Sequence, residues 1–396
     1  MLDSDPRVSC TRRENLRGNA HFLGQNSRTI GEMSSRHVRI LRPLWCRKWT
    51  LCGCMLACSA ELQETPGEFV NYLHEDSLQP CAGTANYIDN FAIWTATSLG
   101  IELTREIEYF WLSSEEYSKT DCPDGSVGCQ ISGHIYSRNP DLLHEVVHAI
   151  TAQAGMNTLP FFTEGIAVAF DPWPGGSAGP RYKFTPPLGQ PQGDPRIYMT
   201  MPAAEVYYDL AGAFVSFLIL RHGAEKLVSF MRRPKGSVDY ATISSLFYEH
   251  YGVSLDDEAE AFIANTPCDE SWTSSLPYDC TSTVVPWDDL AWSWGTTLSC
   301  TEPDIVGGIG PELSLSHLSV TLDIPNGGLY EVRTSSSEKD TRITLGKCFG
   351  CPWYPSDLVL EGNEVQLVEL SAGTHFLRAT ANSRTSPHVT VSLLPK

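Results

Sequence analysis

The chain of 396 residues lacks any run of 18 apolar residues, which is the length that a helix needs to cross a bilayer. Basic residues are also scarce, because 28 Lys and Arg stand against 47 Asp and Glu, for a formal net charge of −19. The first 59 residues hold ten of the basic residues and four of the acidic ones, so the remainder is more acidic still. A body of that sign repels phosphate backbones, which argues against nucleic-acid binding.

Composition and length indicate a folded protein of two domains. Of the residues, 42% are hydrophobic and 19% are charged, which is ordinary for a globular chain. At about 100–200 residues per domain, the length fits two hydrophobic cores. We expect a leader over residues 1–59, a first domain over 60–267, a junction over 268–303 and a second domain over 304–396.

The leader resembles an export signal. From Met33, a candidate start of the chain, a basic segment precedes the short apolar stretch TLCGCMLACSA. Its end, Met55-Leu-Ala-Cys58, resembles a bacterial lipobox, in which the cysteine is lipidated, and Cys54 gives an earlier fit. The alternative is an ordinary signal peptide cut near Ala60. We therefore expect an exported protein, either a cell-envelope lipoprotein anchored to a membrane surface through Cys58 or a secreted one.

Eight cysteines follow the leader, and an even number in an exported chain is typical of disulfides. They are Cys81, Cys122, Cys129, Cys268, Cys280, Cys300, Cys348 and Cys351. Spacing predicts a Cys122–Cys129 bridge around a short loop and a Cys268–Cys280 bridge at the junction. The pair in Cys348-Phe-Gly-Cys351 could serve redox chemistry or zinc, but without a second such pair we favour a structural bridge.

The first domain mixes strand and helix signals, which predicts an α+β fold. Strands are expected over 104–112 and 130–137. A helix is expected from Pro140-Asp141 to just before Gly155, and a second from near Thr163. A third, over 209–223, is apolar almost all round and therefore buried. Two further helical segments are AEKLVSFMRR and LDDEAEAFIAN.

The second domain has a different pattern. Segments such as SHLSVTLDI, GLYEVRTS and HVTVSLL alternate apolar and polar residues between Gly, Asn, Ser and Pro. This pattern predicts an antiparallel β-sandwich. It contains no evident catalytic set, so binding or stabilisation is its expected role.

The stretch His144-Glu145-Val-Val-His148 carries the clearest chemical signal. Positions i and i+4 of a helix share a face, so both imidazoles can reach one Zn²⁺ while Glu145 projects beside them. Glu164 follows sixteen residues after His148, at the start of the second expected helix, and completes a set of three ligands. The alternative role for Glu164 is an acid that stabilises a helix N-terminus. Asp171 is a reserve ligand.

The order HExxH and then Phe161-Phe-Thr-Glu-Gly-Ile-Ala167 is similar to the gluzincin metallopeptidases, in particular the peptidase MA-like group of exported bacterial proteins. The resemblance continues in Tyr208-Asp-Leu-Ala-Gly-Ala-Phe214 and in Tyr251-Gly-Val-Ser-Leu-Asp256, and it covers roughly residues 85–266.

This resemblance implies a zincin-like metallopeptidase domain in front of the sandwich. It makes His144, His148 and Glu164 the ligands of one catalytic Zn²⁺, Glu145 the general base and Tyr208 a hydrogen-bond donor to the oxyanion. The implied activity is zinc-dependent hydrolysis of a peptide or protein substrate, as an endopeptidase, through a metal-bound water. The known family pattern has an acid four residues after the glutamate ligand, where this chain has Val168, so the carboxylate that orients a ligating histidine must come from elsewhere, with Asp171 and Asp209 as candidates.

Two other classes of function stay open. The chain could be a noncatalytic exported surface or binding lipoprotein that keeps a zincin fold, or an adhesion protein in which HEVVH is coincidence. For a peptidase, the strand over 130–137 would pair with extended substrate, and the proline-rich loop over 171–202 would wall the cleft. The aromatic residues of that loop are candidate substrate contacts, although packing is the favoured role for each of them: Trp173, Tyr182, Phe184 and Tyr198. The other histidines of the mature chain, His317 among them, have no ligand spacing and are expected at the surface or satisfied in the core.

Overall fold

The computed structural model describes residues 62–156, 159–171, 173, 193–233, 238–264, 277–287, 291–348 and 358–396. Within the chain, residues from Cys58 to Lys396 form one compact unit. The predictions for the leader, including the start at Met33 and lipidation at Cys54 or Cys58, lie outside the described residues.

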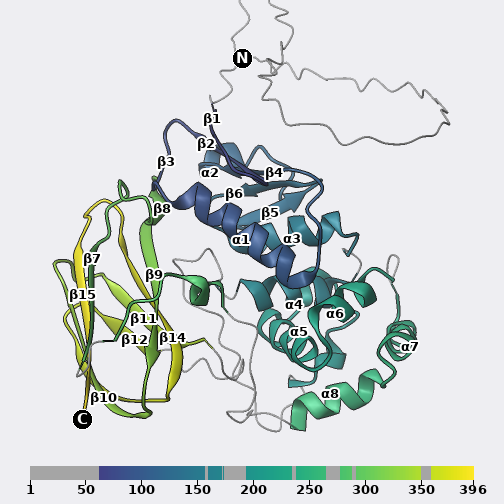
Figure 1. Cartoon of the computed structure of the whole chain (residues 1–396). Helices are drawn as coiled ribbons and strands as arrows, with labels where there is room; N and C mark the ends of the chain where they lie inside the picture. The colour runs from purple at the N-terminus through teal and green to yellow at the C-terminus, as the bar shows by residue number, and fades with distance from the viewer. Residues whose placement is uncertain are drawn as a thin grey trace, which may run out of the picture. The chain divides into compact units, whose positions relative to one another are not determined.

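A five-stranded sheet opens the described chain, in the order β1-β2-β4-β6-β5 (Figure 1). Its strands are β1 (Leu62–Pro66), β2 (Val70–Glu75), β4 (Ile107–Trp111), β5 (Gly128–Ile131) and β6 (His134–Ser137). Strands β2, β4 and β6 are parallel, whereas β1 and β5 run antiparallel along the two edges. The sheet thus ends on β5 as an antiparallel edge strand.

The strand predicted over 104–112 is confirmed by β4, but the single strand predicted over 130–137 is wrong. That segment is the β5–β6 hairpin, because Ser132 and Gly133 both take positive φ, at 55° and 92°, and reverse the chain in two residues.

Helices form the rest of this layer: α1 (Thr84–Leu99), the short α2 (Ser114–Tyr117), α3 (Leu143–Gln153), α4 (Pro160–Phe170), α5 (Tyr208–His222), α6 (Ala224–Met231), α7 (Tyr240–Tyr251) and α8 (Leu255–Ala264). Helices α1 and α3 pack against each other and against the sheet. Alternate sheet residues such as Tyr72, Tyr109 and Ile135 point into the same buried core as the helices. The prediction of a buried helix over 209–223 is confirmed by α5.

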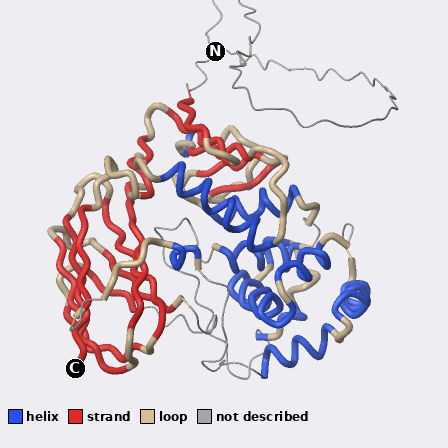
Figure 2. The backbone as a smooth tube through the Cα atoms, in the orientation of Figure 1, coloured by secondary structure: helices blue, strands red, loops and turns tan. Residues whose placement is uncertain are grey.

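The C-terminal strands form two antiparallel sheets (Figure 2). One has the order β13-β10-β15-β7 and the other β12-β11-β14-β9-β8-β3. Their bounds are β3 (Gln79–Pro80), β7 (Trp292–Thr297), β8 (Val306–Ile309), β9 (Ser314–Ile324), β10 (Gly328–Ser336), β11 (Arg342–Lys347), β12 (Leu358–Glu361), β13 (Val365–Leu370), β14 (Gly373–Asn382) and β15 (His388–Pro395). Apolar residues of both sheets share a second core, as the alternating pattern predicts.

Two strand pairings cross the boundaries that the sequence suggests between the two parts. Strand β7 falls inside the predicted junction over 268–303, yet it pairs with β15 as part of a sheet. Strand β3, from the first part of the chain, pairs with β8. The Cys81–Cys300 disulfide lies beside this crossing and links segments 219 residues apart.

The disulfides confirm one predicted bridge and contradict two others. Cys122 and Cys129 are bonded as predicted. Cys280 bonds to Cys348, so the predicted Cys268–Cys280 bridge and a bridge within 348–351 are wrong; Cys268 and Cys351 lie outside the described residues. Three disulfides within the described ranges are consistent with an exported protein. Among those ranges, no helix has both the length and the apolar character that a bilayer span requires.

Candidate metal centre

Helix α3 brings the two histidines of the motif onto one face. The helix begins at Leu143, later than the predicted Pro140, because the preceding segment is held by buried tyrosines. The Tyr72 hydroxyl donates to the Pro140 carbonyl at 3.0 Å, and the Tyr109 hydroxyl accepts from the Leu142 amide at 2.8 Å. The chain turns into the helix only after these bonds, so the sheet sets where His144 starts.

Helix α4 supplies the third side chain. It begins at Pro160 rather than near Thr163, since proline is well suited to a first helical position. Glu164 consequently lies beyond the first turn, and the alternative role as an N-terminal acid does not fit it. Gly165, the next residue, is required by packing: a Cβ there would lie 2.6 Å from the Ala211 carbonyl oxygen of α5.

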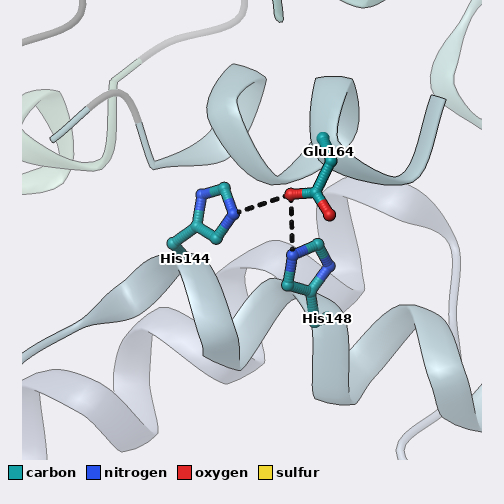
Figure 3. Close-up of side chains that lie close together, drawn as sticks. All are labelled: His144, His148 and Glu164. Atoms are coloured by element: carbon teal, nitrogen blue, oxygen red, sulfur yellow. Dashed lines mark hydrogen bonds and ion pairs between the residues drawn. The ribbon is translucent and has the colours of Figure 1, made fainter. Parts of the chain in front are cut away.

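The three predicted ligands converge (Figure 3). The Nε2 atoms of His144 and His148 each lie 3.2 Å from the same carboxylate oxygen, Oε2 of Glu164. Their side chains are 12–13% exposed, so the cluster is partly shielded from water and still reachable. No other group of three or more potential ligands is found among the described residues.

The electrostatics of the cluster favour an ionised carboxylate. Burial raises the pKa of Glu164, but hydrogen bonds and charge from His144 and His148 outweigh it and leave the pKa far below its usual range. Burial lowers the pKa of His148, whereas the hydrogen bond and charge of Glu164, with the charge of Glu145, raise it by more. The cluster thus places two imidazole nitrogens against one ionised carboxylate oxygen.

This donor set fits zinc. Catalytic zinc sites commonly combine His nitrogens with a carboxylate oxygen at about 2.0–2.2 Å from the metal and leave one position open. Tetrahedral bonds of that length place neighbouring ligand atoms about 3.4 Å apart. The two 3.2 Å separations are close to that value, and all three ligand atoms lie within 4.8 Å of one another.

Glu145 lies on α3 between the two histidines and against the edge strand β5. It is 9% exposed. A Cβ on Gly128 of β5 would lie 3.3 Å from the Cγ of Glu145 and 2.3 Å from Leu142, so only glycine leaves room for the carboxylate arm. The need for glycine at position 128 was not foreseen from the sequence, because it arises between a strand and a helix.

Tyr208, rather than its neighbour Tyr207, lies beside the cluster. Tyr208 is the first residue of α5, and its ring centroid is 6.0 Å from that of His144. Tyr207 is 37% exposed and its ring faces Tyr198 at 6.2 Å. The structure therefore distinguishes the two adjacent tyrosines: Tyr208 lies beside the cluster and Tyr207 does not.

Asp171 is outside the ligand cluster. It directly follows α4, is 1% exposed, and accepts a hydrogen bond from the Trp173 amide at 3.2 Å. Burial raises its pKa to about 8, against the lowering effect of hydrogen bonding from the backbone amides of Trp173 and His144 and of the Arg378 charge. Its carboxyl thus binds the backbone of Trp173 and is not among the clustered ligand groups. For Asp209, burial raises the pKa, and an orienting role stays a prediction.

The aromatic residues considered as substrate contacts differ in their surroundings. Trp173 is 4% exposed and packs with Cys348 and Phe376, so it has the packing role that the sequence analysis favours and not that of a substrate contact. Tyr198 packs, half-buried, against the helical core. Tyr182 and Phe184 lie outside the described residues.

Comparisons with known proteins add no assignment. No family model matches the sequence, and no curated protein matches it. Among solved structures, the pre-peptidase C-terminal domain of a Bacillus anthracis collagenase is 10% identical, with 28% of this chain and 92% of that one covered and a TM-score of 0.19. The Aeromonas hydrophila lysozyme inhibitor PliG is 13% identical, at coverages of 28% and 94% and a TM-score of 0.20. A family 35 carbohydrate-binding module from Clostridium thermocellum is 13% identical, at coverages of 27% and 92% and a TM-score of 0.16. Likeness at this level carries no functional argument.

Proposed function

We propose that this protein is a zinc-dependent peptidase that acts on a peptide or protein substrate. The observation that carries the proposal is the convergence of His144, His148 and Glu164, from two helices, on a point where each can offer one ligand atom. A zinc ion bound by these three residues would supply Lewis-acid polarisation of a carbonyl and would lower the pKa of water.

The protein's own residues divide the remaining work. Glu145 is the general base, which removes a proton from water and delivers it to the leaving amine. The Tyr208 hydroxyl donates to the oxygen of the scissile carbonyl as negative charge develops there. The partial burial of the cluster excludes bulk water and strengthens both interactions.

The edge of the five-stranded sheet is the proposed position of the substrate. Strand β5 has β6 on one side and is the last strand of its sheet, so its other side can pair with an extended peptide. Because Gly128 of β5 lies against Glu145, a peptide along this edge would present its carbonyls close to the base. Among the described residues no strand pairs with the outer edge of β5, so a peptide could extend beyond the site in both directions, and on this basis we propose endopeptidase activity.

Metal analysis of the exported chain, from residue 60 to residue 396, tests the ligand set. We expect about one zinc per chain, lost in His148→Ala and in Glu164→Ala. His250→Ala is the matched control, because that half-buried histidine hydrogen-bonds to the Lys226 carbonyl, outside the cluster. A parent protein without stoichiometric zinc would refute the metal site.

Activity tests the base separately. Glu145→Gln should keep its zinc and lose cleavage of a mixed peptide library by a factor of about 100 or more. A variant that cuts as fast as the parent would refute Glu145 as the base. A parent that binds zinc and cuts no peptide would favour the noncatalytic binding role instead.

Export through a lipid anchor at Cys58 completes the proposal. The disulfides support export, and the intact mass of the protein from a membrane fraction tests the anchor. A diacylglyceryl-modified N-terminal Cys58 is expected, and an unmodified chain that begins near Ala60 would contradict it.

A further inference from the structure

One face of the six-stranded sheet is polar and nevertheless buried. Along β9 this face presents His317, Ser319 and Thr321, and along β14 it presents Arg378 and Thr380, all of them buried. The other face of the same strands contributes the sandwich core. Buried polar groups are costly unless they find partners, so this second face must contact something polar.

The first partner lies at the start of the metal-binding helix. The Nε2 of His317 is 3.0 Å from the Oδ2 of Asp141, and both side chains are 1% exposed. Asp141 precedes the first residue of α3 by two positions and His144 by three. Burial and the charge of Arg378 lower the pKa of His317, so a neutral ring donates to the carboxylate.

The second partner lies at the end of the other ligand-bearing helix. Arg378 donates to Asp279 at 2.9 Å through Nε and 2.5 Å through Nη2, and its guanidinium lies 4.1 Å from the ring centroid of Trp173. Trp173 donates from its indole to Asp279 and from its backbone to Asp171. Asp171 ends α4, the helix that carries Glu164.

Both contacts start from adjacent strands. In the β9–β14 pairing, His317 lies opposite Thr380 and Ser319 opposite Arg378. Ser319 also accepts from Arg378 at 3.2 Å. One sheet thus holds the beginning of α3 and the end of α4 at once.

We propose that the β-sandwich is a structural part of the metal centre, with His317 and Arg378 as positioning residues that fix α3 relative to α4. The inference rests on the proposed zinc site. Its physical reason is that a metal site needs ligand distances within about 0.2 Å, while the three ligands come from two helices. A sheet that clamps both helices supplies that precision without touching the metal.

The test measures zinc affinity of the chain from residue 60 to residue 396 by competition with a chromophoric chelator. His317→Leu removes the bond to Asp141 and should weaken zinc binding at least tenfold, in the range typical for outer-shell partners. His317→Gln retains an N–H donor and should recover most of the affinity. The matched control is His375→Leu: His375 is also buried in β14, but three residues from Arg378 and therefore on the opposite face of the strand, where it hydrogen-bonds to the Gly373 carbonyl.

Replacement of zinc by Co²⁺ gives a visible spectrum that depends on the ligand geometry and that a loss of stability alone does not change. At a temperature where every variant is folded by circular dichroism, His317→Leu and Arg378→Met should shift the visible Co²⁺ spectrum, and His375→Leu should match the parent. Unchanged zinc affinity and Co²⁺ spectrum in folded His317→Leu and Arg378→Met would overturn the inference, as would equal losses in His375→Leu. If His317→Leu does not fold, Arg378→Met decides by the same criteria. A parent that binds no zinc refutes the metal site itself, which separates that failure from this one.

Discussion

Val168 of α4 lies directly against Gly212 of α5: a Cβ added to Gly212 would be 2.4 Å from the Cγ1 of Val168. One turn earlier, Gly165 meets the backbone of Ala211 just as closely. In the peptidase family that this sequence resembles, an acidic residue stands at the position of Val168. Here it faces a neighbouring helix at close approach, so a carboxylate would have no room, and the contact explains why both helices carry glycine.

Gly165→Ala should destabilise the protein by about 1–3 kcal/mol, because the backbone carbonyl of Ala211 cannot move aside and overpacking outweighs the helix propensity of alanine. The measurement is the free energy of unfolding in urea. Gly327→Ala is the control, since this glycine is exposed and its nearest contact, the Ala372 amide nitrogen, is 3.3 Å away and need shift by only a few tenths of an ångström, so the change in stability should be less than about 1 kcal/mol. Equal stabilities for the parent and Gly165→Ala would contradict the close helix crossing.

Gly128→Ala tests the contact between the edge strand and the proposed base. The added methyl would displace Leu142 or Glu145, and a base moved by about 1 Å can lose a factor of about 100 in rate. We expect kcat on a peptide substrate to fall at least tenfold while the zinc content stays at about one per chain. Ile131→Ala changes the opposite face of the same strand and should leave kcat within a factor of about three. The prediction fails if both variants lose the same activity.

The ligand cluster could be predicted from sequence because its information is local. His144 and His148 are one helical turn apart, and Glu164 follows in the next helix, so the helical period alone places the first two together. The buried hydrogen bonds between the β-sandwich side and the two ligand-bearing helices could not be predicted in this way. His317 is 176 residues from Asp141, and Asp279 is 106 residues from Trp173, and no local pattern links such partners.

The fold shows the same division. The alternating pattern predicts most of the strands from β9 to β15, whereas no local pattern predicts helix α1. Its sequence, TANYIDNFAIWTATSL, is rich in β-branched and aromatic residues of modest helix propensity, and Gly83 before it provides no side-chain cap. Helix α1 exists because its buried face packs on α3 and on the sheet, and Gly100 at φ 63° ends it.

Tyr208→Phe tests the proposed donor to the oxyanion. Removal of one such donor typically costs about 100- to 1,000-fold in kcat, and because the hydroxyl is not a ligand, zinc affinity should not change. Tyr207→Phe is the matched control, as the adjacent tyrosine is turned toward Tyr198, and it should behave as the parent. A Tyr208→Phe enzyme with full kcat would leave the tyrosine a packing role beside His144.

The buried histidine of the sandwich should make stability depend on pH in one direction. Four groups face the His317 ring: Asp141 before α3, Tyr87 of α1, Arg378 of β14 and Asp279. Burial and Arg378 lower the pKa of His317 by more than the two carboxylates raise it. Below the ordinary histidine pKa of about 6.5, the unfolded chain therefore binds a proton that the folded chain does not.

The contribution of His317 to stability is thus complete above about pH 6.5 and is lost as the pH falls toward its lower folded-state value. Unfolding free energies measured in urea from pH 8 to pH 5 should fall more steeply for the parent than for His317→Gln, by up to about 1.4 kcal/mol per pH unit, and the two curves should run parallel above pH 7. The difference between the curves isolates this one residue, because every other titrating group is common to both proteins. Parallel curves down to pH 5 would mean that folding does not lower the pKa of His317, and a parent that gains stability relative to His317→Gln as the pH falls would mean that the ring pairs with Asp141 as a cation.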